Sequence, residues 1–327
     1  MKTKKGDIWE KLDHFMLYCD SKNLSRKTLA SYQQTIQLFL IFLERECKIT
    51  SIDKVKPLHI RQYVKHLRER GKYTVVANEK SKEINYPDRR NDAGKAISDT
   101  TIANYLRNIK VFFNFLYQER EIKVNPCENI ENIKPHRKKK PLLSRDEIKK
   151  VLDAIDTTTF HGYRTWVQTR LTLDTGIRAS ECCALRPEHV DFDTKSILIE
   201  NPKNKQQRYV YFSHKMSTDL KRWMKYRDRF SDSPYLFPTI RGTQQDIRNF
   251  ERSLRAAGKK VGVDIYPHKL RNNFAKYYLL NGGDWASLSR ILGHSSAEVT
   301  QKAYLDFTDE EIGRKYQKHS PLSHLDI

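Results

Sequence analysis

The chain has 327 residues, which is long for one average domain and sufficient for two, each able to bury a core of its own. It carries 61 lysine and arginine residues against 40 aspartate and glutamate residues, a formal net charge of +21, alongside 17 tyrosine and 14 phenylalanine residues. So many aromatic residues argue against a basic disordered tail, and no apolar run approaches the roughly 20 residues of a membrane span. Both halves of the chain, divided at Lys140, are basic. The expected partner is therefore a polyanion such as nucleic acid, against the alternative that the excess charge only confers solubility.

The cysteines and the amino-terminal residues favour a reducing compartment. The cysteines are Cys19, Cys47, Cys127, Cys182 and Cys183. They are odd in number and form no C-x-x-C pair, which gives no zinc signature. We interpret them as small buried hydrophobic residues or as residues without a role of their own. The polar start of the chain has no apolar segment behind it, so a cytoplasmic location is expected.

Helical periodicity dominates the first third of the chain. Apolar residues recur at helical spacing in four stretches, which are Ile8 to Cys19, Ser25 to Leu43, Pro57 to Leu67 and Ser98 to Leu116. Ser25 and Ser98 are N-cap candidates, and Pro57 suits the first turn of a helix. The pattern predicts four amphipathic helices. In the third, Arg61, Lys65 and Arg68 form a basic stripe that either faces DNA or is an ordinary solvated face.

A polar, charged segment from Lys72 to Ala96 separates the third helix from the fourth. Only Tyr73 to Val76 suggests a strand, so we interpret the segment as a long loop or a hairpin. Loops of this length are usually functional or disordered, and both readings stay open. Lys82, Arg89 and Arg90 would suit a contact with a nucleic-acid backbone.

A proline-bounded basic stretch, Pro135 to Pro141, indicates a linker to a second domain. Ser144 and Glu147 form a capping box flanked by Leu143 and Ile148, which predicts a well-defined helix start. Two short strands are expected over 196–199 and 209–212. Helical patterns follow over 214–229, 243–258, 268–281, 284–292 and 308–318. The plan is mainly α, with a small antiparallel sheet in the second domain.

Three short motifs in the second domain combine arginine, histidine and tyrosine. In the first, Thr175 to Glu181, a glycine turn feeds a helix that begins near Arg178. In the second, Tyr266 to Arg271, a proline starts a helix and the i, i+3 spacing sets His268 and Arg271 on one face. The third is Leu292 to His294, with Tyr304 ten residues later.

Such residues suit phosphodiester chemistry without a metal. Arginine forks hold non-bridging phosphate oxygens and offset charge in the transition state. A tyrosine can hold the phosphate covalently, and a lysine can protonate the departing sugar oxygen. We assign this role to Lys203 in the predicted hairpin loop, and Lys205 is the alternative. Tyr316, Tyr277 and Tyr278 rival Tyr304, but none of them follows a Gly-His turn at a suitable distance.

The motifs Thr-Gly-Ile-Arg-Ala-Ser-Glu, Pro-His-Lys-Leu-Arg and Leu-Gly-His-Ser-Ser, followed by a tyrosine, resemble the tyrosine recombinase (phage integrase) family, which shares its catalytic fold with type IB topoisomerases. The resemblance implies that Arg178 and Arg271 clamp the scissile phosphate, that His268 assists proton transfer and that His294 hydrogen-bonds the phosphate. It further implies that Lys203 protonates the 5′-oxygen and that Tyr304 forms a 3′-phosphotyrosyl bond. Glu181 would be a structural support.

The resemblance also implies a domain plan. A four-helix, SAM-like core-binding domain would occupy residues 1–133, with an insertion at about 72–96. A linker over 134–142 would lead to a catalytic domain over 143–327, whose segment from about 306 docks onto a neighbouring subunit through Phe307, Ile312 and Tyr316. A separate arm-binding domain is not expected. The candidate DNA-contacting residues are Arg26, Lys27, Arg61, Lys65, Arg68, Arg107, Lys138, Lys139, Lys140 and Lys205.

The implied activity is site-specific recombination of DNA with no metal or nucleotide cofactor, since no phosphate-cradling G-x-x-x-x-G-K-[ST] loop and no acidic metal cluster is evident. The implied partners are a duplex site with inverted repeats, a dimer per site and a tetrameric synapse in the nucleoid, and an accessory directionality factor. Two alternatives stay open: relaxation of DNA in the manner of a type IB topoisomerase, and a DNA-binding protein that has lost cleavage.

Overall fold

The computed structural model divides the chain into two compact units, Met1–Lys138 and Lys139–Ile327. It describes residues 7–77, 82–83, 86–135, 142–200, 207–230, 232–294, 313 and 316. Over those residues, no helix is both long and apolar enough to cross a membrane. The expected linker lysines, the hairpin loop and the helix over 308–318 fall in the gaps, so they lie outside the described residues apart from positions 313 and 316.

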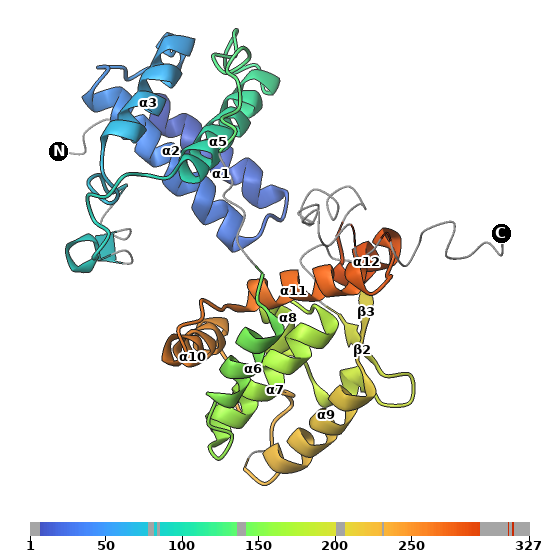
Figure 1. Cartoon of the computed structure of the whole chain (residues 1–327). Coiled ribbons are helices and arrows are strands. Elements are labelled where there is room, and N and C mark those ends of the chain that lie inside the picture. Colours follow the sequence, from blue (N-terminus) through green and yellow to red (C-terminus); the bar gives the residue numbers. More distant parts are fainter. Residues whose placement is uncertain are drawn as a thin grey trace. The chain divides into compact units, whose positions relative to one another are not determined.

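The first unit is a bundle of the four predicted helices (Figure 1). They are α1 (Asp7–Ser21), α2 (Arg26–Arg45), α3 (Pro57–Glu69) and α5 (Asp99–Gln118), joined in part by the short turns η1 (Ile52–Lys54) and η2 (Pro87–Arg89). The hydroxyls of Ser25 and Ser98 accept hydrogen bonds from the backbone N–H groups three residues on, so both predicted N-caps are confirmed. Phe15 and Phe112, both fully buried, meet edge to face with ring centroids 5.3 Å apart.

The segment between α3 and α5 is closed at its base. An antiparallel bridge pairs Gly71 with Ala96, and a Cβ on Gly71 would lie 2.4 Å from the carbonyl oxygen of Gly94. The structure has no strand over 73–76, where the sequence only suggested one: residues 73–75 form a turn and bends, and Tyr73 has a φ of 62°, in the left-handed region that a strand does not use. The guanidinium of Arg90 lies 4.2 Å from the centre of the Tyr73 ring. The segment that follows Gly71 therefore starts as a loop and not as a strand of a hairpin.

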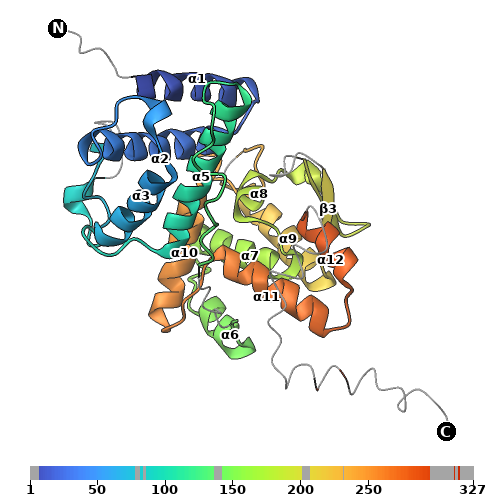
Figure 2. The same ribbon diagram turned by 90° about the horizontal axis from the view of Figure 1, so that it is seen from above.

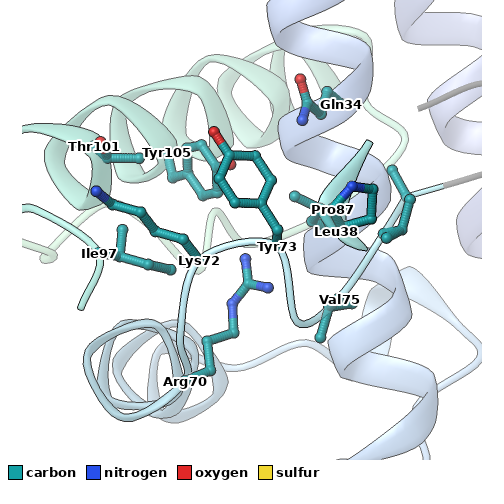
Figure 3. A pocket seen from close by; sticks show the side chains of 12 residues that line it. Gln34, Leu38, Arg70, Lys72, Tyr73, Val75, Pro87, Ile97, Thr101 and Tyr105 are labelled. Atoms are coloured by element: carbon teal, nitrogen blue, oxygen red, sulfur yellow. The ribbon is translucent and has the colours of Figure 1, made fainter. Parts of the chain in front are cut away.

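The first residues of this loop line a pocket of about 300 Å³ (Figure 3). Side chains from α2, α5 and the loop line it, with the guanidinium of Arg70 directed toward the Tyr73 ring and Tyr105 close by. The loop base is thus folded onto the bundle.

The second unit contains seven α-helices among the described residues and one small sheet. The helices are α6 (Arg145–Asp153), α7 (Phe160–Thr175), α8 (Ala179–Ala184), α9 (His214–Arg227), α10 (Ile247–Lys260), α11 (Pro267–Leu280) and α12 (Trp285–Leu292). The antiparallel sheet follows the turn η3 (Pro187–His189) and has the order β1 (Val190–Asp191), β2 (Ser196–Ile199), β3 (Arg208–Tyr211). The two predicted strands are confirmed, with β3 starting one residue early and Ile199 opposite Arg208. Helix α10 begins four residues later than expected because Asp246 caps it.

Helix α7 was not predicted, although it runs through the middle of the second unit with α11 and α9 packed against it (Figure 2). Polar residues are buried on it, so the apolar-polar alternation that signals a helix is absent. Four threonines satisfy their hydroxyls on the carbonyl oxygens four residues back; they are Thr165, Thr169, Thr172 and Thr175. These bonds allow a polar helix to be buried.

The predicted capping box at the start of the second unit is confirmed. The Ser144 N–H donates to the carboxylate of Glu147 at 2.7 Å, and the Glu147 N–H donates to the hydroxyl of Ser144 at 3.1 Å. The buried amide of Asn273 on α11 accepts from the N–H of Leu143 and donates to its carbonyl oxygen, at 3.2 and 2.8 Å. The start of α6 is thereby fastened to the helix that carries the second motif.

Candidate active site

The first motif is built at the junction of α7 and α8. Gly176 ends α7 with a φ of 66°, and a Cβ there would lie 2.3 Å from Cδ1 of Phe274, so only glycine fits this turn. Arg178 is the N-cap of α8, and its N–H donates to Oε2 of Glu181 at 3.0 Å. Its Nη1 donates to Oε1 of the same carboxylate at 2.8 Å, which holds the guanidinium.

Arg271 brings the second motif to the first. It lies one turn into α11, which Pro267 starts as expected, and it is 3% exposed. Its Nη1 donates to the carbonyl oxygen of Gly176 at 2.6 Å. Its Nη2 donates to the carbonyl oxygen of Leu292 at 2.5 Å and lies 3.4 Å from Nε2 of His294. One buried guanidinium therefore contacts all three sequence motifs.

The third motif is the turn that ends α12. Gly293 has a φ of 61° and closes the helix, and its carbonyl oxygen accepts from Nη2 of Arg178 at 3.1 Å. His294 follows and is half-buried, while His268 on α11 is exposed and close enough to influence the charge of His294. The structure thus brings Arg178, Arg271 and His294 into one cluster with His268 beside it.

The charges in this cluster set two unusual pKa values. Burial, followed by the positive charges of Arg271, Arg178 and Arg208, lowers the pKa of His294 from 6.5 to about 4. Burial alone would raise the pKa of Glu181, but the hydrogen bonds and charges of Arg208 and Arg178 lower it from 4.5 to about 2. Near neutral pH the histidine is neutral and the glutamate is ionised.

These pKa values make the second unit sensitive to acid. The unfolded chain binds a proton on His294 near pH 6.5, whereas the folded chain binds it near pH 4, so the free energy of unfolding falls as the pH drops through that window. Glu181 adds a second loss between pH 4.5 and about pH 2. In urea unfolding across this pH series, His294→Asn should remove the first loss and keep the second. An unchanged pH dependence in the variant would contradict the assignment to His294.

One residue of the cluster was missed from the sequence. Arg208, at the start of β3, donates from Nη1 and Nη2 to the two carboxylate oxygens of Glu181 at 3.0 and 2.7 Å, and its side chain is 8% exposed. The period of two along the strand sets Arg208 on the same inner face as the buried Val210. A buried arginine needs hydrogen-bond acceptors in the core, so an arginine on the inner face of a strand was the available signal.

The remaining predicted site residues are placed less fully. Lys203, Lys205, Tyr304 and the linker lysines Lys138, Lys139 and Lys140 lie outside the described residues. Among the rival nucleophiles, the hydroxyl of Tyr277 donates to the carbonyl oxygen of Leu143 at 3.4 Å, and the ring of Tyr278 packs on Phe274. The first-unit DNA candidates are all exposed, on α2, α3 and α5; they are Arg26, Lys27, Arg61, Lys65, Arg68 and Arg107. Their contact with DNA stays a prediction.

The two cysteines that directly follow the first motif are packed in the core. Cys182 and Cys183 on α8 are fully buried. Burial raises the pKa of Cys183 to about 12 and that of Cys182 well above its ordinary value, so both thiols are protonated near neutral pH.

The chain is similar to known proteins in both sequence and fold. Residues 141–311 match the phage integrase family, and residues 12–81 match the N-terminal SAM-like domain of phage integrases. The chain is 29% identical to the tyrosine recombinase XerC of Thermodesulfovibrio yellowstonii over 96% of both chains. Its fold is similar to that of the Tn1549 transposon integrase solved with transposon right end DNA, at 17% identity over 96% of this chain and 99% of that one, with a TM-score of 0.74. It is also similar to a lambda integrase tetramer bound to a Holliday junction, at 14% identity over 94% and 80%, with a TM-score of 0.68.

The fold and the cluster therefore define a tyrosine-type site-specific recombinase. Because the match from residue 141 to residue 311 covers more than half of the chain, the protein belongs to the phage integrase family.

Proposed function

We propose that this protein cuts and rejoins duplex DNA at a recombination site through a covalent bond between Tyr304 and the 3′-phosphate. The observation that carries the proposal is the convergence of Arg178, Arg271 and His294 at the end of α12, ten residues before Tyr304. A scissile phosphate at this cluster would meet two permanent positive charges and a neutral imidazole.

The two arginines would be ready before DNA binds. Backbone carbonyl groups at the ends of α7 and α12 hold Arg271, and Glu181 with Gly293 holds Arg178. Both charges are thereby fixed in place, so little reorganisation is needed as charge develops on the phosphate.

His294 would act as a neutral hydrogen-bond donor. A guanidinium can only donate, so Nε2 of His294 accepts from Arg271, and the proton of a neutral ring then resides on Nδ1. Nδ1–H can donate to a non-bridging phosphate oxygen. The pKa of about 4 keeps this tautomer populated near neutral pH.

The proposed reaction conserves the energy of the phosphodiester. The phenolic oxygen of Tyr304 bonds to phosphorus while the bond to the 5′-oxygen breaks; His268 assists removal of the tyrosine proton, and Lys203 delivers one to the 5′-oxygen. Attack by a 5′-hydroxyl reverses these steps and reseals a strand. Lys205 remains the alternative acid. The balance of atoms needs no nucleotide and no metal.

A substrate with a nick next to the cleavage position tests the proposal. Loss of the short strand beyond the nick prevents resealing, so the wild type should accumulate a covalent protein–DNA adduct and Tyr304→Phe should form none. Tyr316→Phe is the matched control, because Tyr316 is also carboxy-terminal to His294, is 58% exposed, and loses only its hydroxyl while the ring available for docking is kept. It should form the adduct at the wild-type level.

The same experiment separates the alternatives. If the wild type binds its site but forms no adduct, the chain is a DNA-binding protein without cleavage. If it forms an adduct and relaxes supercoils but exchanges no strands between two sites, its activity is that of a topoisomerase. Exchange of strands between two sites is the expected result.

We further propose two protomers on inverted repeats and a tetramer in the synapse, acting on DNA in the nucleoid with an accessory directionality factor. The lambda integrase solved as a dimer on a core site and as a tetramer on a Holliday junction supports this assembly. The segment from about residue 306 would dock on a neighbour through Phe307, Ile312 and Tyr316. The exposed ring of Tyr316 is compatible with such docking.

A further inference from the structure

The carboxyl end of α12 is held by three arginines from three different elements. The carbonyl oxygens of Ile291, Leu292 and Gly293 accept, in that order, from Arg208 on β3, Arg271 on α11 and Arg178 at the start of α8. The last carbonyls of a helix lack intrahelical partners and carry the negative end of its dipole. Three guanidinium groups satisfy them here, so the turn that carries His294 is fixed by side chains from elsewhere in the unit.

Protein acceptors engage all three nitrogens of the Arg208 guanidinium. Nη1 and Nη2 bind the two oxygens of Glu181, and Nε donates to the carbonyl oxygen of Ile291 at 2.8 Å. Its side chain is 8% exposed, against 22% for that of Arg178. Because each of its nitrogens already donates to a protein acceptor, Arg208 is poorly suited to bind a phosphate itself.

Glu181 pairs with both arginines and so links the position of Arg178 to that of Arg208. The carboxylate is 3% exposed in its side chain and lies between the two guanidinium groups, 2.7 Å from Nη2 of Arg208 and 2.8 Å from Nη1 of Arg178. Removing Arg208 would leave a buried carboxylate with Arg178 as its remaining side-chain cation among the described residues. The guanidinium of Arg178 would then be drawn toward it.

Arg208 also packs on the turn before His294. A Cβ on Gly293 would lie 2.9 Å from Cδ and from Nε of Arg208, so this turn and the arginine stem are in close contact. The strand β3 lies against α12 (Figure 1). Arg208 therefore ties the strand that follows the 201–206 segment to the helix end that carries His294.

We propose that Arg208 is a positioning residue that fixes Arg178 and His294 relative to β3, without touching DNA. This inference rests on the proposed function, because it assigns Arg208 a part in the same cleavage step. It predicts an effect on the rate of chemistry and not on affinity for the site.

The test compares three variants on the nicked substrate at saturating protein. Arg208→Ala should slow single-turnover cleavage about 100-fold, the size of effect that a misplacement near 1 Å produces, while the Kd for the site changes by less than about threefold. Arg208→Lys keeps a charge but cannot form the two parallel hydrogen bonds to the carboxylate of Glu181, so it should restore little of the cleavage rate. Arg186→Ala is the control, because Arg186 also pairs with a glutamate, Glu188, but at the surface with 49% of its side chain exposed. It should cleave like the wild type.

A spectroscopic readout tests whether the charge of Arg208 acts on His294 in the folded protein. With Arg208 gone, the imidazole of His294 loses a nearby positive charge, so its pKa should rise above about 4 in a folded Arg208→Ala protein, as followed by NMR of the ring proton. If Arg208→Ala does not fold, Arg208→Met, which keeps an apolar stem and removes the charge, gives the same comparison.

Each outcome bears on one claim. Cleavage by Arg208→Ala within about threefold of the wild-type rate, or a parallel loss of rate and DNA affinity, overturns the positioning role. Absence of a Tyr304-dependent adduct in the wild type instead overturns the proposed function. The two failures are therefore distinguishable.

Discussion

Replacing Arg271 by alanine is expected to abolish strand cleavage and to destabilise the second unit. The change removes a fixed positive charge from the phosphate site, which should slow adduct formation by about 1,000-fold or more. It also leaves the buried carbonyl oxygens of Gly176 and Leu292 without their arginine donor, which should lower the free energy of unfolding by about 2 to 5 kcal/mol. Single-turnover cleavage and urea unfolding measure the two effects.

Two further variants make this prediction specific. Arg271→Lys keeps a cation but cannot donate to two separate carbonyl groups and approach His294 at once, so it should recover part of the stability and little of the rate. Arg255→Ala removes an arginine that is 54% exposed and pairs loosely with Asp264, at 3.7 Å. It should leave both measurements near the wild-type values. Cleavage by Arg271→Ala at a tenth of the wild-type rate or faster would contradict the role given to Arg271.

Most helices of this protein could be predicted because each has one apolar face and a recognisable start. Ser25, Ser98 and Ser144 all cap the helices expected behind them. Helix α7 was not predicted because it is buried on several sides, and the hydroxyls of its threonines donate to backbone carbonyl groups of the same helix. The turn at Tyr73 was not predicted because the composition of the segment favours a strand, whereas the backbone turns at this residue with a positive φ.

The site shows a similar division. Arg178, Arg271 and His294 could be chosen from the sequence because each lies in a short motif beside a glycine or a proline that shapes the local backbone. The sequence does not display the acceptors that hold them, because these are mainly backbone carbonyl groups, which every residue has. Arg208 was missed because its partners, the carboxylate of Glu181 on α8 and a backbone carbonyl group of α12, lie far from β3 along the chain.

A substitution at Gly176 is expected to show how strongly the turn between α7 and α8 supports the site. In Gly176→Ala, the new Cβ would lie 2.3 Å from Cδ1 of Phe274 and 3.0 Å from Cδ2 of Leu292. Crowding of this kind, together with a φ of 66° in a residue other than glycine, should cost about 2 to 4 kcal/mol. Because the carbonyl oxygen of Gly176 accepts from Arg271, cleavage should slow as well.

The matched control is Gly262→Ala, because Gly262 has nearly the same φ, 71°, and a Cβ added there would have no atom within 4 Å. It carries the backbone cost alone, about 1 kcal/mol, and should cleave at the wild-type rate. The difference between the two variants in urea unfolding therefore isolates the contact with Phe274. Equal losses of stability would show that the backbone conformation, and not the packing of α11 and α12 on this turn, makes glycine necessary at position 176.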